Sequence, residues 1–235
     1  GVGKTALTLN TGIGAARRGA RVCSLDLDPE VCATRFRMPD SLLGHTDGLN
    51  SVIEVLEHVL RIVDNVLPSR FDGVSFLPSK PKMRRVERMV GGKNPKYLLK
   101  DRMGGMEDNF DLILFDLPPA FNTIESSAYI TSDIVICPLD EDVFSIDSAT
   151  MTIEDIEDVC KNFDTDIPLI RILRNKTTPE GRLSHQDTFK ELMREHAEKV
   201  LPFHFKDKAA IKNSINNGQS IFDLKGEVSV KEAFG

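Results

Sequence analysis

The chain begins with Gly1-Val2-Gly3-Lys4-Thr5, a run whose residue types and spacing suit the binding of phosphate groups. Glycine lets the backbone curl so that consecutive N–H groups point at an anion. Lys4 brings a mobile positive charge to the outer phosphates, and the Thr5 hydroxyl is a suitable ligand for Mg²⁺. The predicted nucleotide-binding residues of this loop are Gly1, Val2, Gly3, Lys4, Thr5 and Ala6.

This run matches the second half of a phosphate-loop pattern, which also has a glycine four residues before Gly3 and a strand ahead of it. A chance GxGKT is the alternative. The apolar periodicity of 6–18 predicts a helix directly after the run, and a helix N-terminus favours negative charge. We therefore interpret the run as a phosphate loop and expect the first strand of the fold to be missing from this sequence.

Two carboxylates follow the short apolar run 21–26, which predicts a buried strand. Asp26 and Asp28 would then lie where open α/β sheets bind their ligands, outside the carboxyl ends of the strands. One role for either residue is to cap the next helix. The other is to orient the water that attacks a γ-phosphate or to hold the Mg²⁺ shell, and we favour this role for Asp28.

A second apolar run, 111–116, ends in Asp116 and has the form of a Walker B strand, which delivers a carboxylate to Mg²⁺ beside the phosphate loop. Pro118 and Pro119 make the following segment stiff and extended, as suits a loop that senses the γ-phosphate. The sequence thus predicts Lys4, Asp28 and Asp116 as catalytic residues. The predicted metal ligands are Thr5 and, through water, Asp116.

Asn175 ends a further apolar run, 168–174. Its amide can bond a purine edge or form a turn, and the sequence leaves both open. Helices are expected over 46–63, 145–162 and 181–200, between the apolar runs. Such alternation predicts one α/β domain over 1–235, a three-layer sandwich of the P-loop NTPase type. Its mostly parallel, twisted sheet would carry helices on both faces.

Composition narrows the function classes. The 235 residues are 40% hydrophobic, and no apolar run approaches the roughly 20 residues that span a bilayer. The four cysteines form no CxxC pair, which favours a reducing cytosol over a zinc site. A net charge of −6 argues against general affinity for nucleic acid. The stretch 80–102 is nevertheless rich in Lys and Arg, so it is either a solvated face or a surface for DNA or another anionic partner.

Four motifs occur together in one order: the glycine loop, Asp-Leu-Asp-Pro-Glu at 26–30, Phe-Asp-Leu-Pro-Pro at 115–119 and Ile-Cys-Pro-Leu-Asp-Glu at 136–141. With the late segment 208–222, this arrangement resembles the ParA/Soj partition ATPases, within the wider group that includes MinD and the nitrogenase iron protein. The resemblance covers almost the whole chain. A cluster-ligating cysteine of the nitrogenase type is missing between Asp116 and Cys137.

The resemblance implies a deviant Walker A loop whose signature lysine would lie just before Gly1 and reach the nucleotide of the partner subunit. It implies that Asp28 positions the attacking water, that Thr5 ligates Mg²⁺ with support from Asp116, and that Asn175 contacts adenine. The family usually has Gln where this chain has Glu30, which puts the rate of hydrolysis in question.

The implied function is a cytoplasmic ATPase that is slow and stimulated by a partner. It would form a homodimer with ATP and act in plasmid or chromosome partitioning with a ParB-like centromere-binding adaptor. Non-specific DNA is a further implied partner, and association with the nucleoid would follow from it. A membrane is not expected, because 226–235 lacks the basic amphipathic character of a MinD-like C-terminal helix. The alternatives are a MinD-like or other cargo-positioning switch and a small-molecule P-loop kinase or synthase.

Overall fold

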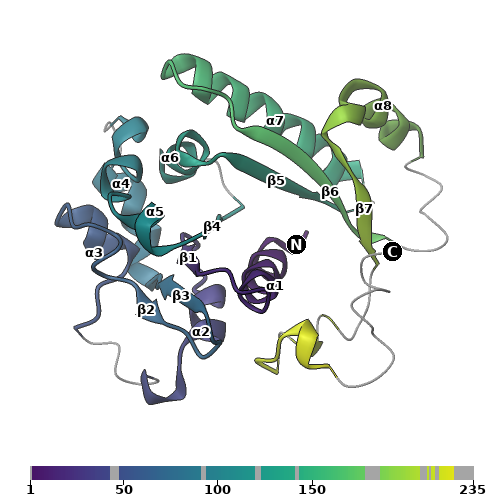
Figure 1. Ribbon diagram of the computed structural model, residues 1–235. Helices are drawn as coiled ribbons and strands as arrows, with labels where there is room; N and C mark the ends of the chain where they lie inside the picture. The colour runs from purple at the N-terminus through teal and green to yellow at the C-terminus, as the bar shows by residue number, and fades with distance from the viewer. Residues whose placement is uncertain are drawn as a thin grey trace. The chain divides into compact units, whose positions relative to one another are not determined.

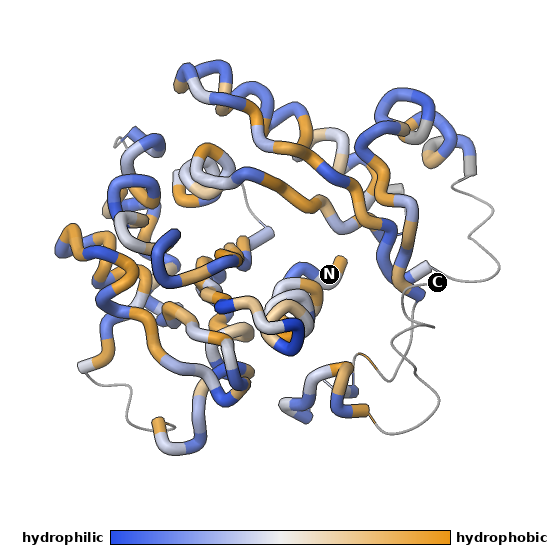
Figure 2. Tube along the Cα trace, in the orientation of Figure 1, coloured by the Kyte–Doolittle hydropathy of each residue, from blue (hydrophilic) through white to orange (hydrophobic). Residues whose placement is uncertain are grey.

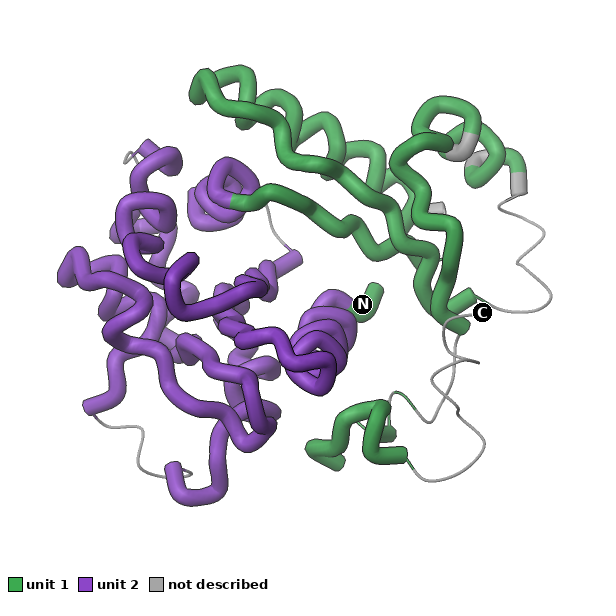
Figure 3. Tube along the Cα trace, in the orientation of Figure 1, with its two compact units in different colours: residues 1–3, 132–235 green, residues 4–131 purple. Residues whose placement is uncertain are grey.

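The structure is a computed structural model that describes residues 2–42, 48–90, 94–119, 123–140, 143–177, 186–206, 211, 213–214 and 217–224. The chain divides into two compact units, shown in Figure 3. Unit 1 consists of 1–3 and 132–235, and unit 2 consists of 4–131. Both units combine helices with mainly parallel strands (Figure 1), so the predicted α/β class is confirmed.

Unit 2 is built on a four-stranded sheet of order β2-β3-β1-β4. Its strands are β1 (Val22–Asp26), β2 (Leu67–Pro68), β3 (Val74–Leu77) and β4 (Leu112–Asp116). β1 pairs in parallel with β3 and β4, whereas β2 is antiparallel to β3. The runs expected to be strands near 21–26 and 111–116 do form β1 and β4. The residues of β1 are all buried, and the apolar residues of β4 are partly buried.

Helices cover both faces of this sheet. On one face lies α1 (Lys4–Ala16). It packs closely on β4 at Gly12, where an added Cβ would stand 3.3 Å from a methyl carbon of Leu114. On the other face a buried apolar cluster joins β1 to α3 (Val52–Glu57), α4 (Val86–Val90), α5 (Met106–Asn109) and α6 (Thr123–Thr131). Because side chains alternate along a strand, Asp116 shares the α1 face with Leu114. The sheet thus turns this acidic strand end toward the start of the chain.

The helix expected over 46–63 is much shorter than predicted. Ser51 and Glu54 form a capping box that begins α3, and the helix ends before His58. Val59 takes a left-handed φ of 54° and is 70% exposed, so it lies outside the helix and outside the buried core. Residues 43–47 lie outside the described part of the chain. The apolar residues after Glu57 continue the helical spacing in the sequence, but the left-handed backbone at Val59 cannot continue the helix.

Short helices connect the longer elements of unit 2. They are α2 (Cys32–Arg37), η1 (Asp40–Leu42), η2 (Pro81–Arg85), η3 (Pro95–Tyr97) and η4 (Lys100–Arg102). The four η elements are short 3₁₀ helices. Prolines begin η2 and η3, at positions where the N–H that proline lacks would have no partner within the helix.

Unit 1 contains the parallel sheet β5-β6-β7, formed by Ile134–Leu139, Leu169–Thr177 and Val200–Lys206. α7 (Val143–Asn162) packs on β5, and α8 (Gln186–His196) packs on α7. Figure 2 shows the apolar residues that run along β5. Short 3₁₀ turns, η6 (Ala197–Lys199) and η7 (Ile221–Asp223), follow α8 and end the described chain.

Two expectations for unit 1 need correction. β6 continues through Asn175 to Thr177, so the predicted strand 168–174 was too short. α8 covers only part of the helix predicted over 181–200, and 178–185 are outside the described residues. Within the described chain, no helix is both long enough and apolar enough to cross a membrane.

Arg102 holds part of unit 2 together from the inside. Its guanidinium is buried, with 6% of the residue exposed, and it donates to four backbone carbonyls. Two of these belong to α3, at Val55 (3.3 Å) and Leu56 (3.4 Å). The others lie in and after η3, at Tyr97 (3.2 Å) and Leu98 (2.6 Å). Arg102 therefore donates to carbonyls near helix ends, of which that of Val55 also accepts from the Leu60 amide at 3.0 Å.

We expect Arg102→Met to lower the free energy of unfolding by about 2–4 kcal/mol, since buried carbonyls would lose their donors. Urea denaturation measures the change. Arg85→Met, at an exposed position of η2, is the matched control and should cost less than about 0.5 kcal/mol. Equal losses in both variants would contradict the structural role of Arg102.

Candidate active site

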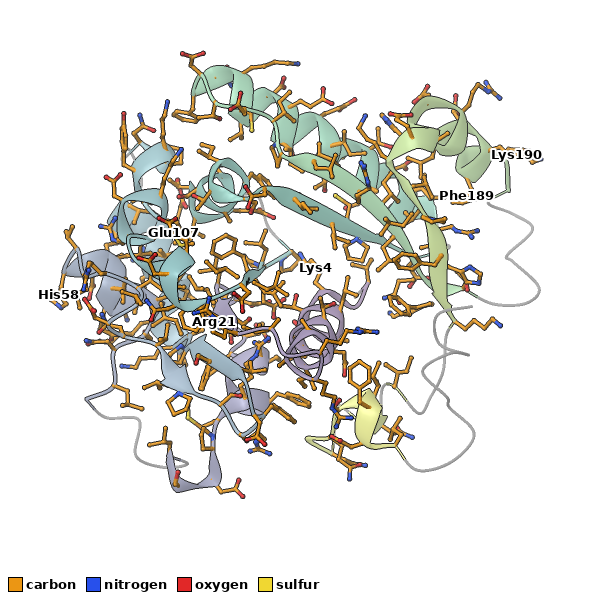
Figure 4. The ribbon with its side chains drawn as sticks, in the orientation of Figure 1. Lys4, Arg21, His58, Glu107, Phe189 and Lys190 are labelled. Carbon is orange, nitrogen blue, oxygen red and sulfur yellow. The ribbon has the colours of Figure 1, made fainter. Side chains whose placement is uncertain are left out.

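The predicted loop lysine contacts the segment that follows the predicted Walker B strand. Lys4 is the first residue of α1, and its Nζ donates a hydrogen bond of 2.6 Å to the carbonyl oxygen of Pro118 (Figure 4). Pro118 lies two residues beyond Asp116, where β4 ends. Unit 2 therefore brings two motifs that are more than a hundred residues apart in sequence to one place.

Asp26 and Asp116 end neighbouring strands in the same register, and both are buried. Asp26 is fully engaged in holding α2: its Oδ2 accepts from the Thr34 amide (2.7 Å) and hydroxyl (2.6 Å). Its Oδ1 accepts from the amide of Asp28 at 3.2 Å. Asp26 therefore takes the structural role that the sequence offered as an alternative.

Asp116 is less well satisfied. Its Oδ1 is 3.5 Å from the Thr8 hydroxyl, a long contact, and its buried Oδ2 has no hydrogen-bond partner among the described residues. Burial and, after it, the charge of Asp26 raise the pKa of Asp116 to about 6, although a hydrogen bond from Thr5 and the charge of Arg37 act in the opposite direction. A buried carboxylate oxygen without a partner suits a cation or its bound water.

Arg37 is a residue that the sequence reasoning missed. It is 1% exposed, and its Nη1 and Nη2 have no hydrogen-bond partners within the described chain. Burial lowers the pKa of Arg37 to about 10, against the charges of Asp116 and Asp26, which raise it. No local pattern marked Arg37, because an arginine is rarely buried and nothing in the six residues of α2 distinguishes it from Arg35.

Asp28 lies half-buried in the connection from β1 to α2. Its Oδ1 accepts from the Glu30 amide at 2.8 Å, and its carbonyl accepts from the Val31 amide at 3.1 Å. Val31 closes this turn with φ 63° and ψ 18°, a left-handed conformation that is costly for a β-branched residue. The side chain predicted to orient water thus forms part of a tight, strained turn.

Unit 1 holds the first part of the loop. The Asn175 side-chain amide donates to the carbonyl oxygen of Val2 at 2.7 Å. Gly3 has φ +91°, and a Cβ there would stand 2.6 Å from Asn175 Nδ2, so glycine is required. Asn175 sits within β6, not in a turn, and Gly1 lies outside the described residues. The adenine contact expected of Asn175 stays a prediction.

Two cations of the basic stretch 80–102 serve inside the protein. Lys80 donates to the carbonyl of Leu49 at 2.7 Å and pairs with Glu54 at 3.3 Å, and Arg102 is buried. The exposed cations of η2 and α4 remain, and we call them the basic surface: Lys82, Arg84, Arg85 and Arg88. The surface available to an anionic partner is therefore smaller than the composition suggested.

Comparison with known proteins identifies the family. A sequence model of the AAA domain family AAA_31 matches residues 1–169. The chain belongs to this family. The predicted resemblance to the ParA/Soj group is confirmed by this match and by the ParA and Soj proteins among its relatives.

The chain is 28% identical over 163 residues to the chromosome partitioning protein ParA of Caulobacter vibrioides, a match that covers 68% of this chain and 59% of ParA. The structure of Cyanothece McdA in complex with ATP superposes with a TM-score of 0.83 at 17% identity, over 96% of this chain and 86% of McdA. The structure of cobyrinic acid a,c-diamide synthase from Mycobacterium smegmatis, with ADP and magnesium, superposes with a TM-score of 0.70 at 24% identity. This match covers 83% of this chain and 78% of the synthase. The structural likenesses support the P-loop NTPase fold.

The raised pKa of Asp116 predicts a stability that depends on pH. Because the folded pKa of about 6 exceeds the ordinary 3.8, the protonated group stabilises the fold below about pH 4, and this contribution is lost as the pH rises through 6. Asp116→Asn removes the buried charge. We expect it to stabilise the nucleotide-free protein by about 1–2 kcal/mol at pH 8 and by roughly half as much at pH 5, where the folded group is mostly protonated.

Denaturant melts at both pH values measure this difference. Asp111→Asn is the matched control, since Arg21 holds the pKa of Asp111 at about 2, in the opposite direction, just before β4. It should not stabilise the protein at pH 8. Equal stabilisation by Asp116→Asn at the two pH values would show that the buried charge is not the cause.

We expect Gly3→Ala to weaken ATP binding by at least about ten-fold, because the added Cβ meets Asn175 and the loop must shift. Titration calorimetry measures the affinity. Gly19→Ala is the control: Gly19 has a similar φ of +93°, but no heavy atom lies within 4 Å of its Cβ position. It should cost about 1 kcal/mol of stability and leave ATP binding unchanged. Unchanged binding by Gly3→Ala would contradict the assignment of the loop.

Proposed function

We propose that this protein binds and hydrolyses ATP and acts as a ParA-like, ATP-dependent dimer switch in plasmid or chromosome partitioning. The observation that carries the proposal is the contact of the Lys4 ammonium with Pro118, next to the buried and incompletely bonded Asp116. This arrangement joins a phosphate-loop lysine to an acid-ended strand, which is the basic requirement of phosphoryl transfer in P-loop enzymes.

The chain supplies charge and position to the reaction. Lys4 and the amides of the loop offset the negative charge that develops on the phosphoryl group. Asp28, at the end of β1, is the residue that we assign to orienting the attacking water. Glu30 replaces the Gln that the family usually carries, so the turn bears one more negative charge beside this water.

Mg²⁺ fits the residues present. The Thr5 hydroxyl and, through water, Asp116 would hold it, since hard oxygen donors and an unpaired buried carboxylate oxygen are the groups that this ion prefers. Bound there, it would offset the charge of the β- and γ-phosphates. Thr5 also acts on Asp116, since a hydrogen bond from its hydroxyl lowers the pKa of that carboxyl.

The proposed partners are a second copy of the chain, a ParB-like adaptor and non-specific DNA. The dimer would form with ATP, and slow hydrolysis would time its release from DNA, which would place the protein on the nucleoid in the cytoplasm. ATP turnover measured with and without DNA and a centromere-binding protein tests this. Turnover that ignores both would contradict partitioning, and turnover that depends on a small-molecule acceptor would favour a P-loop synthase.

We expect Asp28→Ala to reduce ATP hydrolysis by about 100-fold or more, because the water loses its orienting group, while ATP-driven dimerisation persists. Phosphate release and light scattering measure the two properties. Asp72→Ala, at an exposed position before β3, should change neither. Loss of dimerisation together with hydrolysis would show that Asp28 has a different role.

A further inference from the structure

We propose that Arg37 is a positioning residue of the magnesium site: its buried guanidinium balances the charge of Asp116 while no metal is bound and keeps Mg²⁺ from binding there without a nucleotide. This inference rests on the proposed function and names a control on the same site. Arg37 lies in α2, and only 1% of the residue is exposed. Its Nη1 and Nη2 have no hydrogen-bond partner among the described residues. Burial of a guanidinium in this way is costly unless nearby charges compensate it.

The fold brings Arg37 to the ends of β1 and β4. Thr34, one turn earlier on α2, donates to Asp26 Oδ2 through its amide (2.7 Å) and its hydroxyl (2.6 Å). Thr34 and Arg37 are both buried and, being three residues apart, lie on the same face of the helix. Asp26 pairs in register with Asp116. This face of α2 therefore packs at the place where both carboxylates end their strands.

The charges at this place are unequal in number. Burial raises the pKa of Asp116, the charges of Asp26 and Asp28 add to this rise, and the cation that opposes them is Arg37. Burial lowers the pKa of Arg37, and the charges of Asp116 and Asp26 oppose that change. Three carboxylates thus act together with one guanidinium. Their mutual effects are strong because charges in a protein interior are poorly screened.

Arg37 and Mg²⁺ would therefore share one carboxylate. Without a metal, the guanidinium offsets the charge of Asp116, so the two acidic strand ends can stay side by side. Mg²⁺ arriving alone would be repelled by a cation that is fixed inside the protein. The phosphates of ATP bring negative charge that outweighs this repulsion. Arg37 would thus make Mg²⁺ binding depend on ATP, and loss of the phosphates would release the metal.

Urea denaturation of the nucleotide-free protein, with and without about 10 mM MgCl₂ at constant ionic strength, tests this control. A pH of about 8.5 keeps Asp116 charged, since its pKa is about 6. We expect Mg²⁺ to leave the urea midpoint of the wild type nearly unchanged and to raise that of Arg37→Met, because a ligand that binds only the folded state stabilises it. Adding Asp116→Asn to Arg37→Met should remove this response.

Two controls separate the charge of Arg37 from its packing. Arg35→Met removes an exposed cation from the same helix and should respond to Mg²⁺ as the wild type does. Without Mg²⁺, Asp116→Asn should raise the urea midpoint more in the Arg37→Met background than in the wild type, because there the carboxylate has lost its opposing charge. If Arg37→Met does not fold, Arg37→Gln removes the charge but keeps a polar side chain, and the same results are expected.

Titration calorimetry extends the test to ATP. The ratio of the ATP affinities measured with Mg²⁺ and with EDTA reports how strongly the metal supports nucleotide binding. A variant that only loses folded protein weakens both affinities equally and leaves this ratio unchanged. We expect Arg37→Met to increase the ratio at least about three-fold, since Mg²⁺ no longer meets the buried cation. Arg35→Met should leave the ratio unchanged.

Equal Mg²⁺ responses of the wild type and Arg37→Met would overturn the role of Arg37, and so would a response that survives Asp116→Asn. A ratio of ATP affinities that stays constant or falls in Arg37→Met would also contradict it. Absence of ATP binding under every condition would instead refute the proposed function. The urea experiments would in that case still show whether Arg37 restrains Mg²⁺ at Asp116, because they use the metal alone.

Discussion

The structure of unit 2 depends on how the charge of two buried carboxylates is compensated. β1 and β4 end in the same register at Asp26 and Asp116, so the sheet places two acids side by side where neither reaches bulk water. Asp26 is stabilised by the amide and hydroxyl of Thr34, which also begins the attachment of α2. Asp116 keeps an unpaired oxygen, with the buried charge of Arg37 as partial compensation. A fold optimised for stability alone would not retain this group.

Asp26 therefore holds α2, whereas Asp116 keeps an oxygen free for a ligand. The position of Asp28 depends on how Asp26 holds α2. Because Asp26 fixes α2 beneath the strand end, the connection between them is short and closes through a left-handed Val31. In that tight turn the Asp28 carboxylate accepts from the Glu30 amide, and the Glu30 side chain pairs with Arg84. Strain at such a connection is tolerated because the surrounding core determines the backbone on both sides.

The basic stretch shows how far composition and surface can differ. Lys80 and Arg102 contribute to its charge in the sequence, yet both serve as internal hydrogen-bond donors to backbone carbonyls. Four of the cations that stay exposed lie on η2 and α4, and one of them, Arg84, pairs with Glu30 in the turn after β1.

The sequence by itself determined the phosphate loop, the strands around Asp26 and Asp116, and the long helix α7, because glycine stereochemistry and apolar periodicity act over a few neighbouring residues. Family resemblance added the ATPase class. Only the tertiary structure decided that α3 stops at Glu57, that Asp26 is structural, that Arg37 is buried and that Glu30 meets Arg84. The end of α3 depends on the backbone conformation after Glu57, and the other three depend on partners distant in sequence. Local patterns carry no information about which distant groups will meet.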